Sequence, residues 1–285
     1  MTDRDRKHFV SKYGPWALVA GGALGLGEAW CNELAARGLN IISLDRQKEP
    51  LAKQAEQLEK DYGVEVLSID CDLTDSDILN KIKEQTAHLE VGMMVFSAAM
   101  ETDPEIVHSH PFHEGSLDFH ANLIDINIKA VCGFTYHFGK LMKERQRGGI
   151  VLVSSGADGQ GDPFVAHYGA SKAYQTVLAE GLWFEMRPHN VDVIAAPLGL
   201  TRTTALDNFP DAKALGGGIL EADVVVREII ENLGKEPQII PGKKNRMGQF
   251  ILRKLVGKKK AIEMMADIHL DNFMPDLPQY KIYRK

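Results

Sequence analysis

Residues 16–27, WALVAGGALGLG, place five apolar residues directly before a seven-residue stretch that contains four glycines. The apolar residues, Trp16–Ala20, have the length and composition of a buried β-strand. Glycine in the turn permits positive φ angles and lets the backbone approach a diphosphate closely. The free N–H groups at the start of a following helix then face the phosphates. Glycines also close turns for purely structural reasons, but this position predicts a dinucleotide site at Gly21, Ala23, Leu24, Gly25, Leu26 and Gly27.

Downstream of this unit, short apolar strands alternate with longer helical patterns. The predicted helices cover residues 28–37, 50–61, 75–88, 117–145 and 168–187. After the first strand, further strands are predicted at residues 40–44, 64–69, 92–98, 149–154, 191–196 and 237–240. We therefore expect one α/β domain, with a Rossmann-type core of seven parallel, doubly wound strands over residues 14–240 and a C-terminal extension over residues 241–285.

The composition is ordinary for a globular protein, with 285 residues, 44% of them hydrophobic and 25% charged. The net charge of −6 argues against a general nucleic-acid binder. No apolar run approaches the roughly 20 residues that span a bilayer, and the charged N-terminus lacks a secretory signal. The three cysteines, Cys31, Cys71 and Cys132, are too widely spaced for a disulfide framework or a zinc site. We expect a cytoplasmic protein.

Asp45 ends the second predicted strand, about 20 residues beyond the glycine turn. A carboxylate there accepts hydrogen bonds from both ribose hydroxyls of NAD and repels the 2′-phosphate of NADP. Arg46 follows and is able to pair with that phosphate, so NADP stays the alternative to NAD. A solvated turn at Asp45 and Arg46 is the structural alternative. Asp72 and Leu73, after the third strand, are placed to meet the adenine, although Asp72 also suits a helix N-cap.

Ser155, Tyr168 and Lys172 are the candidate catalytic residues. Ser155 follows the fifth predicted strand, Tyr168 lies thirteen residues later, and Lys172 is four positions beyond Tyr168. Helical spacing stacks the phenol and the ammonium one turn apart. A phenol has an ordinary pKa of about 10, and a neighbouring ammonium stabilises its phenolate, which suits it to proton exchange with a carbonyl or alcohol oxygen. Such a pair alone is usually a solvated helix face, but with the glycine turn and a strand-end serine it indicates an oxidoreductase.

Residues from about 13 to 240 resemble the short-chain dehydrogenase/reductase superfamily. The matching stretches are residues 20–27, Asp72-Leu73, residues 125–129, Ser155, residues 168–172 and residues 198–203. The resemblance implies hydride transfer between NAD(P) and a secondary alcohol or ketone, with Ser155 bound to the substrate oxygen and Tyr168 and Lys172 also contacting the cofactor. It implies that Asn127 holds a water that joins Lys172 to solvent; alternatively Asn127 is an ordinary polar helix residue.

The same resemblance implies that residues 198–203 cover the nicotinamide, with cofactor contacts from Gly199, Thr201 and Thr203. Three places depart from the family's pattern. Ala20 replaces a threonine, and Leu198 replaces a proline. Phe96-Ser97-Ala98-Ala99 replaces Asn-Asn-Ala-Gly, a motif that braces the central strand and lines the cofactor. Ser97 and Ala98 are assigned to the cofactor by this position, and no departure removes a chemically active group.

Residues 101–120, 156–165 and 203–218 surround the predicted reaction centre. The first segment carries four histidines, His108, His110, His113 and His120, in a spacing that resembles a loop of metal ligands. The lack of a nearby cysteine and of a family metal favours a rim of the substrate pocket instead, with Phe112 and Phe119 supplying apolar surface. Glycines in the second and third segments indicate an open loop and a flap. Together these features favour a large apolar alcohol or ketone and no metal.

The layout as a whole resembles bacterial hydroxysteroid dehydrogenases of the 7β type, and also steroid 17β-dehydrogenases and long-chain 3-ketoacyl reductases. This resemblance implies a hydroxysteroid or a similar bulky ring substrate and a homodimer or homotetramer. A 3-oxoacyl reductase and a dinucleotide-binding scaffold without turnover are the alternatives.

The extension begins with residues 242–260, in which lysines and arginines accompany Phe250, Ile251, Leu255 and Val256. This pattern predicts a basic amphipathic helix whose apolar stripe docks on the body of the protein or on a second subunit. A membrane surface is the alternative. We expect residues 272–285 to reach the active-site mouth of a neighbouring subunit.

Overall fold

The computed structural model of the protein describes residues 2–100, 110–203 and 218–272, and one large sheet lies at its centre. Its strands are β1 (Trp16–Ala20), β2 (Asn40–Asp45), β3 (Val66–Asp70), β4 (Val91–Phe96), β5 (Gly148–Ser155) and β6 (Val191–Leu198). All neighbours are parallel, in the order β3-β2-β1-β4-β5-β6. This is the order of a doubly wound Rossmann-type sheet, so the predicted fold class is confirmed.

The predicted seventh strand at residues 237–240 is wrong, and the sheet has six strands within the described residues. Gln238 forms an isolated parallel bridge with Ala195 of β6. The N–H of Ala195 donates to the carbonyl of Pro237 at 2.9 Å, and the N–H of Ile239 donates back to Ala195 at 3.0 Å. Prolines at positions 237 and 241 have no N–H to donate to a ladder, so the pairing ends after one residue.

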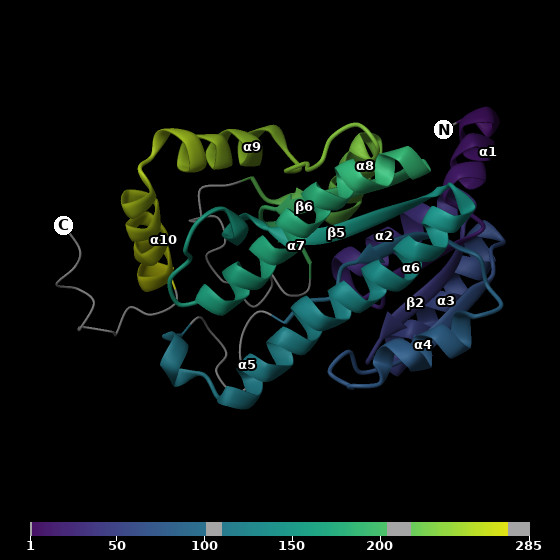
Figure 1. The fold of residues 1–285 in the computed structure, drawn as a ribbon, viewed down its shortest axis with the longest axis horizontal. Helices are drawn as coiled ribbons and strands as arrows, with labels where there is room; N and C mark the ends of the chain where they lie inside the picture. Colours follow the sequence, from purple (N-terminus) through teal and green to yellow (C-terminus); the bar gives the residue numbers. More distant parts are fainter. Residues whose placement is uncertain (1, 101–109, 204–217, 273–285) are drawn as a thin grey trace.

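Helices cover both faces of the sheet (Figure 1). One face packs against α4 (Ile78–Thr86), α6 (Val131–Arg145) and α7 (Ala166–Met186). The other packs against α1 (Asp3–Tyr13), α2 (Gly25–Ala36), α3 (Lys48–Tyr62) and α8 (Ala222–Asn232). Alternate residues of β1 enter the two cores, with Leu18 on the first side and Val19 on the second. Burial on both faces explains why the strands are continuously apolar.

The helix predicted over residues 117–145 is divided into three parts. It consists of α5 (Leu117–Ile124), a π-helical turn (Asp125–Ala130) and α6, which form one continuous rod in Figure 1. Short 3₁₀ turns lie at Phe112–Glu114, Gly156–Gly159 and Arg187–His189. A separate two-stranded sheet pairs β7 (Thr201–Arg202) with β8 (Leu220–Glu221).

The extension contains α9 (Lys243–Phe250), a π-helical turn (Ile251–Leu255) and α10 (Lys258–Asn272), with a sharp bend before α10 (Figure 1). The apolar side chains of Met247, Phe250, Ile251 and Leu255 are exposed, so they do not dock on the body of this chain, one of the two surfaces expected, whereas Ala261 and Leu270 of α10 are buried. Between residues 242 and 260 the contacts with the body are polar: Gln249 donates to the Gly156 carbonyl, and Arg253 pairs with Asp158. No helix among the described residues has the length and apolar character needed to cross a membrane.

Candidate functional site

The glycine turn lies where the strand order reverses, between the carboxyl ends of β1 and β4. Gly21 and Gly25 have φ angles of +78° and +59°, a region that favours glycine. A Cβ on Gly27 would lie 1.7 Å from the Gly21 carbonyl oxygen, so a larger residue does not fit. Leu24 precedes α2 and provides no side-chain cap for its N–H groups. The start of α2 is therefore not closed by a capping side chain, which fits the diphosphate of a dinucleotide.

The ends of β2 and β3 are rich in carboxylates. Asp45 is partly buried, and its Oδ2 and Oδ1 accept hydrogen bonds from the N–H groups of Ala23 and Gln47, both at 3.2 Å. Asp45 is thus bound to the glycine turn and is not part of a fully solvated turn, while Arg46 is exposed. Burial, and then the carboxylates of Asp45, Asp70 and Asp72, raise the pKa of the Cys71 thiol to about 12. This electrostatic environment opposes a further anion.

Asp72 forms a local turn. Its Oδ1 accepts hydrogen bonds from the N–H and the hydroxyl of Thr74, both at 2.8 Å. Because α4 begins only at Ile78, Asp72 is not the N-cap of that helix. The neighbouring Leu73 is partly buried and packs against the core beneath the sheet.

Ser97 and Ala98 join the end of β4 to the glycine turn. Their N–H groups donate to the carbonyl of Ala20 at 2.9 and 2.8 Å. A Cβ on Gly21 would lie 2.7 Å from the Ala98 backbone, so the two segments are in close contact. Residues 97 and 98 thus lie beside the predicted cofactor cradle, although Phe96 and Ser97 stand where the resembling family has two asparagines.

The segment after β6 reaches the same turn from the other side. Thr201 donates its hydroxyl to the Gly199 carbonyl at 3.2 Å. A Cβ on Gly25 would lie 3.1 Å from the Cβ of Thr203, so Thr203 lies directly over the glycine turn. The path from Gly199 to Thr203 therefore crosses the crevice, as a segment that covers a cofactor must.

Tyr168 and Lys172 are brought together with the end of β5. The Lys172 Nζ lies 5.7 Å from the centre of the Tyr168 ring. Lys172 is 2% exposed, and its Nζ donates to the Val153 carbonyl at 2.8 Å. Val153 is two residues before Ser155, the last residue of β5. The ammonium thus connects the phenol on α7 to the strand that carries the serine.

Asn127 is fully buried in the π-helical turn. Its side chain donates to the Met100 carbonyl at 2.8 Å and to the Ser171 hydroxyl at 3.0 Å, and accepts from the Met100 N–H at 2.9 Å. Its main-chain carbonyl accepts from the Gln175 amide at 2.9 Å, and the Gln175 Oε1 accepts from Lys172 at 3.3 Å. Gln175 thus joins Asn127 to Lys172 directly. Gln175 was not among the predicted site residues, although its position three residues after Lys172 on one helix face was a usable signal.

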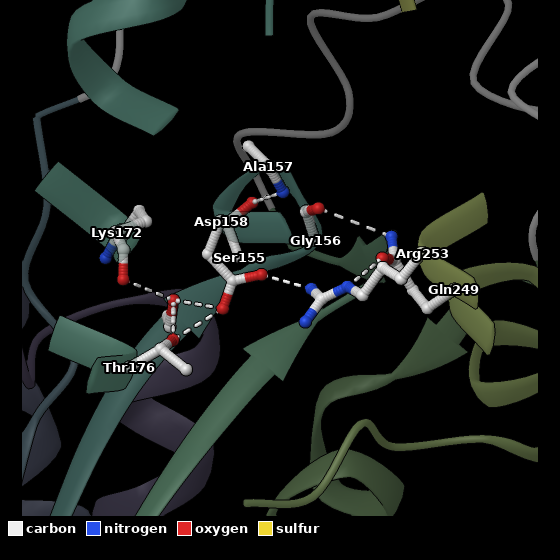
Figure 2. A network of polar contacts seen from close by, with 9 residues as sticks. Ser155, Gly156, Ala157, Asp158, Lys172, Thr176, Gln249 and Arg253 are labelled. Carbon is white, nitrogen blue, oxygen red and sulfur yellow. Dashed lines mark hydrogen bonds and ion pairs between the residues drawn. The ribbon is translucent and has the colours of Figure 1, made fainter. Parts of the chain in front are cut away.

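Ser155 begins a tight turn. Its hydroxyl oxygen accepts a hydrogen bond from the Ala157 N–H at 3.3 Å and so caps the 3₁₀ turn Gly156–Gly159 (Figure 2). The neighbouring Ser154 donates to the Lys172 carbonyl at 2.9 Å. The serine-bearing turn is therefore connected to α7 on the side of Lys172.

A small cavity beside Tyr168 collects histidine and phenylalanine side chains. It is lined by His110, Phe112, Phe119, His120, Phe164, Val165, Ala166, His167 and Tyr168. The position of His110, His120 and both phenylalanines agrees with a pocket rim, whereas His113 is exposed and His108 lies outside the described residues. Within the described residues, no group of three or more His, Cys, Asp or Glu side chains is arranged to hold a metal.

His167, which was not among the predicted site residues, pairs with His120. The two Nδ1 atoms lie 2.9 Å apart, and the His120 Nε2 lies 2.9 Å from the Phe112 carbonyl. Because a carbonyl only accepts, His120 carries its proton on Nε2 and, in the neutral pair, His167 donates from Nδ1. Burial, and then the charge of His120, lower the pKa of His167.

Residues 156–165 were expected to form an open loop, but two of their glycines lie in close contact with the C-terminal extension. A Cβ on Gly156 would lie 2.7 Å from the Gln249 amide nitrogen, and one on Gly159 would lie 2.4 Å from the Arg253 Nε. These glycines admit side chains of the C-terminal extension. Most of the predicted flap, residues 204–217, and the tail, residues 273–285, lie outside the described residues.

Comparisons with known proteins show which proteins this chain resembles. Residues 15–214 match the family model for short chain dehydrogenases. The chain is 30% identical over 239 residues to a 7beta-hydroxysteroid dehydrogenase of Mediterraneibacter gnavus, which covers 82% of this chain and 89% of that protein. It is 35% identical over 185 residues to human 17-beta-hydroxysteroid dehydrogenase type 3, covering 65% of this chain and 58% of the human protein. A solved structure described as giving insights into 7beta-hydroxysteroid dehydrogenase stereoselectivity superimposes with a TM-score of 0.83 at 26% identity, over 90% of this chain and 99% of that one.

Proposed function

The chain belongs to the short-chain dehydrogenase family and is an oxidoreductase, and we propose that it transfers a hydride between NAD(H) and a secondary alcohol or ketone on a bulky hydrophobic substrate such as a hydroxysteroid. The observation that carries this proposal is the buried Lys172 ammonium 5.7 Å from the Tyr168 ring, fixed to the strand that ends in Ser155. A binding scaffold has no need of a phenol so placed.

When bound, the nicotinamide supplies or accepts the hydride. The chain's own residues handle the oxygen and its proton. Tyr168 gives a proton to the carbonyl oxygen during reduction and takes one from the alcohol during oxidation. Ser155 donates a hydrogen bond to the same oxygen, and Lys172 stabilises the phenolate by its charge. Gln175 binds Lys172 and is itself bound to Asn127, so the two amides hold the ammonium in place.

NAD is the cofactor that the binding crevice favours. Gly21, Gly25 and Gly27 would hold the diphosphate, and Asp45 would accept from the adenine ribose. The carboxylates that raise the Cys71 pKa would face a 2′-phosphate, and Arg46, the neighbouring cation, is exposed to solvent. Lys48, the next basic residue, is paired with Asp70 at 2.9 Å.

The aromatic side chains that line the small cavity beside Tyr168 favour an apolar substrate. Phe112 is 48% exposed at its edge and stacks on His120 with ring centres 4.3 Å apart. A flat apolar ring system placed against Phe112 would cover this surface and bring one of its oxygens toward Tyr168. The hydroxysteroid dehydrogenases among the relatives point to the same substrate class.

A substrate panel tests this proposal. The purified enzyme is given NAD⁺ or NADP⁺ with hydroxysteroids and other cyclic alcohols, and NADH or NADPH with the matching ketones and with 3-ketoacyl thioesters. We expect turnover with the ring compounds. Turnover confined to acyl ketones would make the protein a 3-oxoacyl reductase, and tight cofactor binding with no turnover on any member would make it a scaffold.

We further propose that the protein is a homo-oligomer. Large apolar side chains are exposed on α6 and α7, where Tyr136, Val177 and Phe184 are 72%, 66% and 70% exposed. Large apolar side chains so exposed suit burial against a second copy. Light scattering should give a multiple of the chain mass, and Phe184→Glu should shift the protein toward monomer; a wild-type monomer at micromolar concentration would contradict this.

A further inference from the structure

The C-terminal extension contacts the turn that follows Ser155. Asp158 lies in this turn, and its Oδ1 pairs with the guanidinium of Arg253, which comes from the π-helical turn Ile251–Leu255 (Figure 2). The Asp158 side chain is 1% exposed and that of Arg253 is 20% exposed. A carboxylate buried to this extent needs a cation or several donors to balance the loss of hydration. Arg253 is the cation that the structure places there.

The other oxygen of the same carboxylate reaches the proposed reaction centre. Asp158 Oδ2 accepts a hydrogen bond from the Thr176 hydroxyl and lies 3.3 Å from the Ser154 hydroxyl. Thr176 is one helical turn beyond Lys172 on α7, and Ser154 directly precedes Ser155. Asp158 thus connects the extension, the end of β5 and the helix that carries Tyr168.

The guanidinium is itself held in place. Arg253 Nε donates to the Gln249 Oε1 at 2.8 Å, and the Gln249 amide donates to the Gly156 carbonyl at 3.3 Å. Side chains at positions 156 and 159 would collide with Gln249 and Arg253, so the turn and the extension are in close contact. The turn therefore has contacts on two sides, with α7 through Asp158 and with the extension through Arg253 and Gln249.

We propose that Arg253 is a positioning residue for Ser155. Paired with Asp158, it fixes the turn Gly156–Gly159 against α7 and thereby holds the Ser155 hydroxyl in the place where it shares the substrate oxygen with Tyr168. Arg253 acts through Asp158 and need not touch the substrate. This inference rests on the proposed function and adds to it a dependence on the extension, which lies outside residues 15–214, the range of the family match.

Variants at Arg253 test the proposal by kinetics. Arg253→Met keeps the length of the side chain but loses the charge, Arg253→Lys keeps the charge, and Lys254→Met is the control at an adjacent, exposed position. We expect Arg253→Met to lower kcat by about 10- to 100-fold, the scale of an ångström-sized misplacement, with the cofactor KM unchanged. Arg253→Lys should recover most of kcat, and Lys254→Met should match the wild type. An unchanged kcat in Arg253→Met, well below its melting temperature, would overturn the proposal.

A second background separates positioning from general stability. In a Ser155→Ala enzyme the hydroxyl that Arg253 positions is gone, so adding Arg253→Met should reduce the residual kcat little further. If the fold-loss of kcat in the double variant equals the product of the fold-losses in the two single variants, Arg253 does not act through Ser155 and the proposal is overturned.

Hydrogen–deuterium exchange of the cofactor-free protein gives a readout that does not depend on turnover. Amides of residues 156–159 should exchange faster in Arg253→Met than in the wild type or Lys254→Met. Unchanged exchange would overturn the proposed contact even if the enzyme is active. If the wild type reduces no carbonyl but residues 156–159 still exchange faster in Arg253→Met, the contact between the extension and the turn is supported and the proposed function is refuted.

Discussion

The side-chain amide of Gln175 donates to the main-chain carbonyl of Asn127 at 2.9 Å, across the interface between α7 and the π-helical turn. A π-helical turn alters the regular hydrogen bonding of the helix, and such turns are frequent at functional sites. Here the altered turn presents a carbonyl to the residue that also binds Lys172. The rod of α5, the π-helical turn and α6 is therefore joined to α7, which carries Tyr168, by the buried amide of Gln175.

Gln175→Leu keeps the volume of the side chain but removes this connection. Gln175 is fully buried, so the Asn127 carbonyl and the Lys172 ammonium would each lose a partner away from water. We expect the free energy of unfolding to fall by about 1–3 kcal/mol and kcat to fall with it. Urea unfolding and steady-state kinetics measure both effects, with Glu185→Gln, at an exposed polar site on the same helix, as the control. Equal stability of Gln175→Leu and the wild type would contradict this role.

Asp45→Ser should move cofactor preference toward NADP(H). The substitution removes the carboxylate nearest the expected 2′-phosphate and leaves Arg46 in place. A tenfold rise in the ratio of kcat/KM for NADPH to that for NADH corresponds to about 1.4 kcal/mol, a reasonable size for one exposed charge pair. Asp61→Ser, at the far end of α3, should leave the ratio unchanged. A wild-type enzyme that already prefers NADPH by tenfold would refute the assignment of NAD.

The pair of histidines beside Tyr168 predicts a loss of stability in acid. Because burial and the charge of His120 lower the pKa of His167 below its ordinary 6.5, the unfolded chain binds more protons than the folded protein as pH falls through this value. Stability should therefore be greatest above pH 6.5 and decrease below it. Thermal melting from pH 7.5 to 5.5 measures the decrease, which should be smaller in His167→Gln and unchanged in His88→Gln, an exposed control. An equal decrease in His167→Gln and the wild type would count against the pair.

Much of the fold was predictable because its signals are local. Strands buried on both faces are continuous apolar runs, and the glycine turn has a single reasonable geometry between a strand and a helix. Helix α1 was not predicted, because its sequence is mostly charged and only Phe9 and Tyr13 are buried. Helix α8 was also missed, although Val225, Val226, Ile229 and Ile230 repeat with helical spacing and are buried together.

The connections around the site were not predictable because they join distant parts of the chain. His120 and His167 are 47 residues apart, and Asp158 and Arg253 are 95 residues apart. Each of these side chains read alone suits a surface position, and only the packing of α5, α7 and the extension brings them together. The same holds for residues 242–260, where the apolar stripe is visible in sequence but the face that contacts the body is polar.

The central claim is that Tyr168 is the proton donor and acceptor, and one matched pair of variants tests it most directly. Tyr168→Phe removes the hydroxyl beside Lys172. Tyr174→Phe removes a hydroxyl on the same helix. Burial and a hydrogen bond with Cys132 raise the pKa of the Tyr174 hydroxyl to about 12. The measurement is kcat for a hydroxysteroid with NAD⁺, together with cofactor affinity from fluorescence titration. We predict that Tyr168→Phe lowers kcat by about 100- to 10,000-fold with the cofactor Kd unchanged, while Tyr174→Phe resembles the wild type. A Tyr168→Phe enzyme with more than a tenth of the wild-type kcat would contradict the claim.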